Sequence, residues 1–191
     1  MHAVIFEAMP KPGQLDAYLA LAGSLRPALE QVDGFLDNRR FRSRRRPGWL
    51  LSLSTWRDEA ALLRWRGHEP HRAAQRQGRQ QVFQDYRLRV GCMRDGDAAT
   101  AAGPLLTIVE GRRPDGMSAD DPPADLAAAL SGLSDLPGWD LFAGLQAPDD
   151  LLLLLDWEGG AGSGTRPGRA VDVLRDYGLS RREQAPAGTR P

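Results

Sequence analysis

Cysteine is nearly absent from this chain of 191 residues, and Cys92 is its only one. A single thiol excludes a disulfide within the chain and a zinc site built from several thiolates. The sequence also lacks an apolar run of membrane-spanning length and the charged start and apolar core of a signal peptide. We therefore expect a cytoplasmic protein that does not associate with membranes.

The chain has no excess of charge of either sign, because 25 basic residues balance 25 acidic ones. Long-range attraction to nucleic acid is therefore not expected to dominate its behaviour. The densest basic run is at residues 39–46, where six arginines surround Phe41. Because this run falls at the tip of an expected hairpin, we interpret it as a solvated or salt-bridged turn and expect no nucleic-acid partner.

The sequence also lacks a glycine-rich phosphate loop that opens a helix after a strand. Its glycine-rich segment, residues 159–168, is expected to form a long loop that does not lead into a helix in this way. A metal site is poorly supported, because His68 and His71 have no third ligand near them in the sequence. We therefore expect no flavin, no nicotinamide and no metal.

What the chain does contain is an internal repeat. Four short patterns recur in the same order: residues 4–7 at 107–110, 33–35 at 137–139, 53–56 at 154–157, and 82–88 at 173–179. A duplicated unit of this size predicts two similar half-structures that pack on each other.

The first copy has the pattern of a β-α-β-β-α-β unit. We expect strands at residues 2–8, 35–43, 49–56 and 83–93, with helices over residues 15–32 and from the cap Asp58 to about residue 81. Pro27 should kink the first helix, and the second should break near Pro70 and resume through Ala73 and Ala74. Two helices cover one face of such a sheet, so the other apolar face must find a partner.

The second copy follows a linker at residues 95–103 and supplies that partner. Strands are expected at residues 104–112, 140–146, 151–157 and near 173–179, with a short helix at 125–133. A glycine-rich loop at residues 158–168 stands where the first copy has its long helix, so we expect one competent site per chain, in the first half. The predicted fold class is α+β, with two tandem ferredoxin-like units packed sheet to sheet as a pseudo-dimeric α+β barrel. The units span residues 1–95 and 103–185, and residues 186–191 form a disordered tail.

The first half resembles the antibiotic biosynthesis monooxygenase (ABM) domain. The resemblance rests on a set of short matches at residues 4–8, 25–27, 33–35, 50–54, 56–59, 65–66, 71–75 and 85–89. Membership of that family implies a ferredoxin-like subunit that dimerises into an α+β barrel. It also implies one of several activities, including cofactor-free oxygenation of phenolic substrates and haem degradation.

The resemblance argues against haem degradation. The position of the family's axial histidine is aligned with Gln75, although His71 one turn earlier could take its place. The family's distal asparagine on the first strand has no counterpart near Phe6 or Glu7. We therefore expect no haem and no other cofactor. The cofactor-free reaction would require deprotonation of an electron-rich substrate in a site that excludes water.

Three candidate catalytic residues lie on the second helix. Trp65 matches a pocket tryptophan of several family members, although a purely structural role in the core is equally open. His68 and His71 are three residues apart, and either could accept a phenolic proton near neutral pH. Alternatively, the two histidines make caps and surface hydrogen bonds.

Four candidate substrate-binding residues lie on strands. Asn38 could orient a substrate carbonyl or simply face solvent. Arg87 and Arg89 share one face of the last strand and could bind a phenolate or carboxylate, whereas Tyr86 faces the opposite way with Leu88. Arginines at the rim of the sheet are the structural alternative.

The sequence and the resemblance together predict an ABM-type monooxygenase that oxidises an aromatic or polyketide-like small molecule with molecular oxygen and without a cofactor. The alternative is a non-enzymatic small-molecule-binding or stress-related protein of the same fold. We expect a monomer with an internal pseudo-dimer, or a homodimer of such chains.

Overall fold

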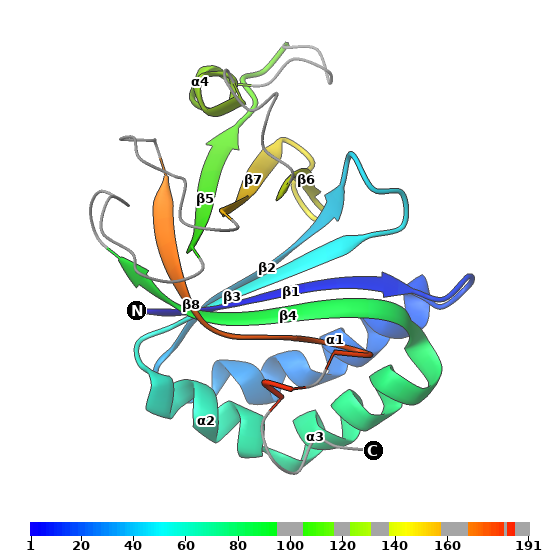
Figure 1. The fold of residues 1–191 in the computed structure, drawn as a ribbon. Helices are drawn as coiled ribbons and strands as arrows, with labels where there is room; N and C mark the ends of the chain where they lie inside the picture. Colours follow the sequence, from blue (N-terminus) through cyan, green and yellow to red (C-terminus); the bar gives the residue numbers. More distant parts are fainter. Residues whose placement is uncertain (95–104, 117–122, 131–137, 158–167, 182, 186–191) are drawn as a thin grey trace. The chain divides into compact units, whose positions relative to one another are not determined.

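The computed structural model describes residues 1–94, 105–116, 123–130, 138–157, 168–181 and 183–185 (Figure 1). The elements in chain order are β1 (His2–Pro10), α1 (Leu15–Glu30), β2 (Phe35–Ser43), β3 (Leu50–Trp56), α2 (Glu59–Gly67), α3 (Glu69–Gln77), the π-helical turn η1 (Gly78–Val82), β4 (Phe83–Arg94), β5 (Leu105–Arg112), α4 (Ala124–Leu130), β6 (Gly138–Gly144), β7 (Asp150–Trp157) and β8 (Arg169–Gly178).

The strands are hydrogen-bonded in the order β1-β3-β2-β6-β7-β5-β8-β4, and this order closes as a barrel. The predicted fold class, an α+β barrel of tandem ferredoxin-like units, is confirmed. The expected linker at residues 95–103, the glycine-rich loop apart from its last residue, and the tail at residues 186–191 lie outside the described residues.

The chain forms two compact units that do not follow the repeat. Unit 1 contains Met1–Arg39, Ser52–Val90 and the described residues from Arg175 onward, and unit 2 contains Arg40–Leu51 and the described part of Gly91–Leu174. Strands β2, β3, β4 and β8 therefore each contribute residues to both units. The domain boundaries at residues 95 and 103 stay a prediction.

In unit 1, helices cover one face of the sheet, as Figure 1 shows for α1, α2 and α3 beside β1 and β4. A buried apolar cluster joins the helices to the strands, with Leu29 from α1, Trp65 from α2, Trp56 from β3 and Val90 from β4. The cap predicted for α2 is confirmed, because the Asp58 side chain accepts the backbone N–H of Ala61 at 2.8 Å.

The turn before β2 requires a glycine. Gly34 has φ of 88°, and a Cβ at this position would lie 2.7 Å from the Cβ of Ala61 on α2. A side chain here would strain the backbone and push α2 away from the turn. The glycine in the Asp33-Gly34-Phe35 pattern therefore sets how closely α2 approaches the start of β2.

The expected break of the second helix lies at His68, two residues before Pro70. His68 is extended and ends α2 while starting α3, and Pro70 occupies the first turn of α3. Proline is tolerated there because the first N–H groups of a helix have no intrahelical acceptor. The break expected near Pro70 is thus present, and Pro70 lies in the first turn of the helix that resumes after it.

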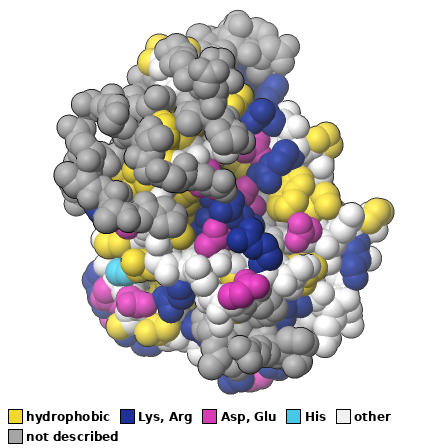
Figure 2. All heavy atoms as spheres, viewed as in Figure 1, with side chains coloured by type: hydrophobic (Ala, Val, Ile, Leu, Met, Phe, Trp, Pro, Cys, Tyr) yellow, Lys and Arg dark blue, Asp and Glu magenta, His cyan; other side chains and the backbone are white. Residues whose placement is uncertain are grey.

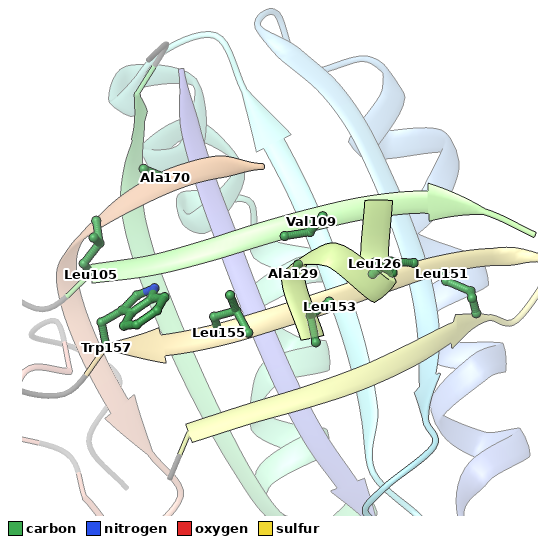
Figure 3. Packing of buried hydrophobic residues seen from close by; sticks show 9 residues of the cluster. All are labelled: Leu105, Val109, Leu126, Ala129, Leu151, Leu153, Leu155, Trp157 and Ala170. Carbon is green, nitrogen blue, oxygen red and sulfur yellow. The ribbon is translucent and has the colours of Figure 1, made fainter. Parts of the chain in front are cut away.

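In unit 2, β5 pairs antiparallel with β7 over the whole of its length, and β6 pairs with the other edge of β7. Figure 3 shows the apolar cluster on one face of these strands, with Leu126 and Ala129 of α4 lying over residues of β5 and β7. Leu153 and Leu155 of β7 are fully buried in it. Both units therefore have an apolar core of their own.

The arginine-rich hairpin tip also belongs to unit 2. Asp140 of β6 is buried and accepts hydrogen bonds from the Ser43 hydroxyl at 2.8 Å and the Arg46 Nε at 2.7 Å. The Arg45 guanidinium lies 3.6 Å from the centroid of the Trp139 ring. Within this run, Arg46 is therefore salt-bridged and Arg45 lies over an aromatic ring. Basic and acidic side chains are likewise intermixed on the face drawn in Figure 2.

Across the described parts of the chain, no helix is both long enough and apolar enough to cross a membrane.

Candidate active site at the joint of α2 and α3

The joint between α2 and α3 brings the three predicted catalytic residues together. The His71 imidazole stacks on the Trp65 indole with ring centroids 4.5 Å apart and planes inclined by 16°. The His68 imidazole stacks on the same indole at 5.3 Å and 19°. Trp65 itself is buried in the apolar cluster of unit 1, so the core holds the ring on which both histidines lie.

The carbonyl of Trp65 fixes the backbone and one side chain of this joint. It accepts the backbone N–H of His68 at 3.1 Å and the Nδ1–H of His71 at 3.0 Å. A carbonyl oxygen is only an acceptor, so the proton of a neutral His71 must be on Nδ1. The second ring nitrogen, Nε2, is then an acceptor, and it faces the side-chain amide of Gln75 at 3.4 Å.

Burial keeps His71 neutral. Desolvation lowers the pKa of His71 from its usual 6.5 to about 4, the Trp65 carbonyl acts in the opposite direction, and nearby His68 lowers the pKa further. A group with this pKa is a weak proton acceptor at neutral pH, although its Nε2 lone pair accepts a hydrogen bond. The proposed base role of His68 or His71 therefore stays a prediction.

His68 has an unused polar atom at the same place. Its Nδ1 is buried, and no group in the described part of the chain is within hydrogen-bonding distance. A buried polar atom without a partner costs roughly 1–3 kcal/mol relative to one that is satisfied. The joint therefore combines an indole carrying two stacked imidazoles with one buried ring nitrogen, Nδ1 of His68, that has no partner in the described residues.

Asn38 lies buried on β2 with its amide orientation determined by its neighbours. The Nδ2 group donates to the Ser52 hydroxyl at 2.9 Å and to the Leu53 carbonyl at 3.2 Å. Its Oδ1 is buried and has no partner among the described residues. The amide donor that would contact a substrate carbonyl is thus already engaged, and the atom left for a ligand is an acceptor.

Both candidate arginines on β4 have carboxylate partners. Arg87 binds both oxygens of Asp176, with the shortest distance 2.6 Å from Nη2 to Oδ2. Arg89 is almost completely buried, and its Nη2 forms an ion pair with the buried carboxylate of Glu7 on β1. These partners neutralise the two guanidinium groups, which makes them weaker receptors for a substrate anion than the sequence suggested.

Tyr86 is buried in an aromatic group rather than beside the histidines. Its ring centroid is 5.5 Å from that of Phe6 and 6.1 Å from that of Phe83, and Tyr18 of α1 contacts the same Phe83 ring at 5.5 Å. These contacts support a packing role for the ring.

The sheet separates the predicted residues into two sets. Leu88 and Val90 of β4 pack in the cluster under the helices, and side chains alternate along a strand. Arg87 and Arg89 therefore point to the opposite face of β4 from the one that faces the helices and Trp65. The structure brings Trp65, His68 and His71 together, and it leaves the arginines on the other side of the sheet.

Two residues of the joint were not predicted as site residues. Gln75, one turn after His71, is its hydrogen-bond partner, and an i, i+4 spacing within one helix could have indicated the contact. Arg66 follows Trp65 on α2, is partly buried, and has no carboxylate partner in the described residues. Desolvation lowers the pKa of Arg66, Tyr177 nearby raises it, and Arg175 lowers it. The sequence gives no sign that Arg66 differs from the other arginines.

Within the ranges that the structure describes, no three His, Cys, Asp or Glu side chains are grouped to hold a metal ion.

Comparison with known proteins identifies the family of this chain. The model of the family described as ABM, Antibiotic biosynthesis monooxygenase, matches residues 1–77. A protein of Pyricularia oryzae named Jasmonate monooxygenase ABM is 42% identical to this chain, over 97% of this chain and 97% of the relative. A solved antibiotic biosynthesis monooxygenase is 24% identical over 50% of this chain and 98% of its own, with a TM-score of 0.43. An anthrone oxidase-like protein is 13% identical over 97% of this chain and 96% of its own, with a TM-score of 0.39.

The family model and the near full-length relative together show that the chain belongs to the antibiotic biosynthesis monooxygenase family.

Proposed function

We propose that this protein is a monooxygenase that inserts one atom of O₂ into a small molecule of the jasmonate class, while two electrons and two protons from a co-reductant reduce the other atom to water. The observation that carries the proposal is the 42% identity to the jasmonate monooxygenase over almost the entire length of both proteins. Jasmonate is a small cyclopentanone carboxylate, so its recognition requires an apolar surface, a contact for the ketone and a contact for the carboxylate.

The joint of α2 and α3 is the proposed binding surface. Trp65, with His68 and His71 stacked on its indole, forms the base of this surface. The Nδ1 of His68, which has no partner in the described residues, is the polar atom left for a ligand. At neutral pH, His71 acts as a neutral hydrogen-bonding group rather than as a charge. In this proposal the three residues position the substrate, and the buried surroundings of Trp65 limit the access of water.

Arg66 is the proposed contact for the carboxylate. It adjoins Trp65 on α2, and the Arg87 and Arg89 guanidinium groups are already paired with carboxylates. A partly desolvated arginine without a carboxylate partner in the described residues would gain a charge-assisted hydrogen bond from the substrate.

The direct test is to incubate the purified protein with jasmonic acid under isotopically labelled oxygen gas. The proposal expects consumption of oxygen and a product that is heavier by one labelled oxygen atom, measured by mass spectrometry. Parallel reactions with and without an added reductant such as NADPH or ascorbate show which source of electrons the reaction requires. A Trp65→Ala variant that still folds serves as the control for background oxidation.

Other outcomes would redirect the proposal. Turnover of phenolic polycyclic substrates, without turnover of jasmonic acid, would favour the aromatic substrate class that the sequence predicts. Binding of jasmonic acid without any product would favour the non-enzymatic small-molecule-binding alternative. Absence of both binding and turnover would refute the jasmonate proposal.

A further inference from the structure

Gln75 is the hydrogen-bond partner of the second ring nitrogen of His71. It lies on α3 one turn after His71, so the two side chains are on the same side of the helix. Its Nε2 faces the Nε2 of His71 at 3.4 Å, a long contact for a hydrogen bond. The other ring nitrogen is engaged with the Trp65 carbonyl at 3.0 Å.

The chemistry of these two contacts links the orientation of the Gln75 amide to the charge of His71. The Trp65 carbonyl requires a proton on Nδ1, so a neutral ring has a lone pair on Nε2 and needs a donor there. The NH₂ group of Gln75 is such a donor. If the amide turned its oxygen toward Nε2, that nitrogen would need a proton as well, and the ring would become a cation.

We propose that Gln75 is a positioning residue for His71: by donating to Nε2, it adds to the effect of burial and holds the neutral imidazole in the Nδ1–H form, with Nε2 as a hydrogen-bond acceptor. The consequence for turnover rests on the proposed function. The effect on the imidazole itself does not, because it follows from contacts within α2 and α3.

Few other charges act on this imidazole. His68 is the titratable group that influences it, through its position on the same indole. Glu69, in the first turn of α3, is exposed and pairs with Arg76 at 3.0 Å and with Arg72 at 3.5 Å. The residue at position 75 therefore has the closest polar contact with Nε2, and a change of its charge should act directly on His71.

The test compares Gln75→Glu and Gln75→Met with the matched control Gln77→Glu, by NMR of the imidazole nitrogens across a pH titration. Gln77 is exposed at the end of α3, so its substitution adds the same charge to the same helix without contact to His71. The wild-type ring should be neutral and protonated on Nδ1 at neutral pH. A carboxylate at position 75 should favour the cation and raise the pH at which His71 titrates by about 1–3 units.

Gln75→Met keeps the test decisive if the glutamate variant does not fold. Loss of the donor removes a stabilisation of the neutral ring, so His71 should titrate at a higher pH than in the wild type and at a lower pH than in Gln75→Glu. The Gln77→Glu protein should titrate like the wild type. A wild-type ring protonated on Nε2, or position-75 variants that titrate like the wild type, would overturn the proposal.

Turnover separates this inference from the proposed function. In Gln75→Glu, kcat with jasmonic acid should fall in mild acid, where His71 becomes a cation, and recover toward neutral pH as that cation loses its proton. Gln77→Glu should keep the wild-type pH profile. If the wild-type protein makes no product, the proposed function fails and the NMR titration still decides the role of Gln75. A Gln75→Glu enzyme with the predicted titration but an unaltered pH profile would remove His71 from the reaction and refute the positioning role in catalysis.

Discussion

The side chain of His71 contacts Trp65 twice: its ring stacks on the indole at 4.5 Å, and its Nδ1 donates to the carbonyl of the same residue at 3.0 Å. The two contacts fix both the plane of the imidazole and the nitrogen that carries its proton. Because Trp65 is anchored in the apolar cluster of unit 1, His71 is held by the core of that unit.

The depressed pKa of His71 predicts a loss of stability in mild acid. The unfolded chain binds the proton near pH 6.5 and the folded chain only near pH 4, so between these values the unfolded state binds more protons. The stabilisation is complete above pH 6.5 and decreases as the pH falls toward 4. The melting temperature of a His71→Gln protein should therefore fall less over this interval than that of the wild type. A His2→Gln protein is the control, and equal slopes in all three proteins would contradict the prediction.

Replacing both histidines of the joint should impair turnover without preventing folding. The double substitution His68→Ala with His71→Ala removes both imidazoles from the Trp65 surface and should reduce kcat by about 10²-fold or more, as the loss of a proton-transfer group commonly does. The measurement is initial-rate kinetics with jasmonic acid, with circular dichroism to verify the fold. Unchanged turnover would exclude both residues from the mechanism.

Arg66 should determine whether the protein distinguishes a carboxylate from its ester. The wild type should bind jasmonic acid more tightly than its methyl ester, because the ester cannot form the charge-assisted hydrogen bond. In Arg66→Met this preference should decrease by about tenfold to hundredfold, the value of one hydrogen bond to a charged group. Isothermal titration with the two ligands measures the ratio. Arg64→Met is the matched control, because Arg64 lies two residues earlier on α2 and is paired with Asp33, and it should keep the wild-type ratio.

The apolar cluster of unit 2 should be sensitive to truncation of a single leucine. Leu153→Ala removes a fully buried side chain of β7 and should lower the free energy of unfolding by about 2–5 kcal/mol. Leu174→Ala on β8 is the control, because that side chain is 51% exposed and its loss should have little effect. Urea denaturation compares the two. Equal losses would mean that this cluster does not stabilise the protein more than the exposed position does.

Much of this protein follows from local sequence. The alternation and the turn residues of the first half predict β2 to the residue and β3 and β4 to within one, because side-chain periodicity and turn chemistry are properties of neighbouring residues. The Asp58 cap and the proximity of His68 to His71 also follow from local sequence, because residues three apart lie within one turn of each other. The helix break near Pro70 also follows from local sequence, because proline is tolerated in the first turn of a helix and not in its interior.

The sequence alone did not determine the electrostatic environment of the candidate residues. From the sequence, Arg87 and Arg89 on β4 were candidates to bind a substrate anion. Their partners Asp176 and Glu7 come from distant parts of the chain, and only the pairing of strands brings them into contact. Arg66 and Arg87 are the same residue type in similarly charged surroundings in the sequence. Tertiary structure decided which has a carboxylate partner among the described residues, because burial and ion pairing depend on distances in space rather than on separation along the chain.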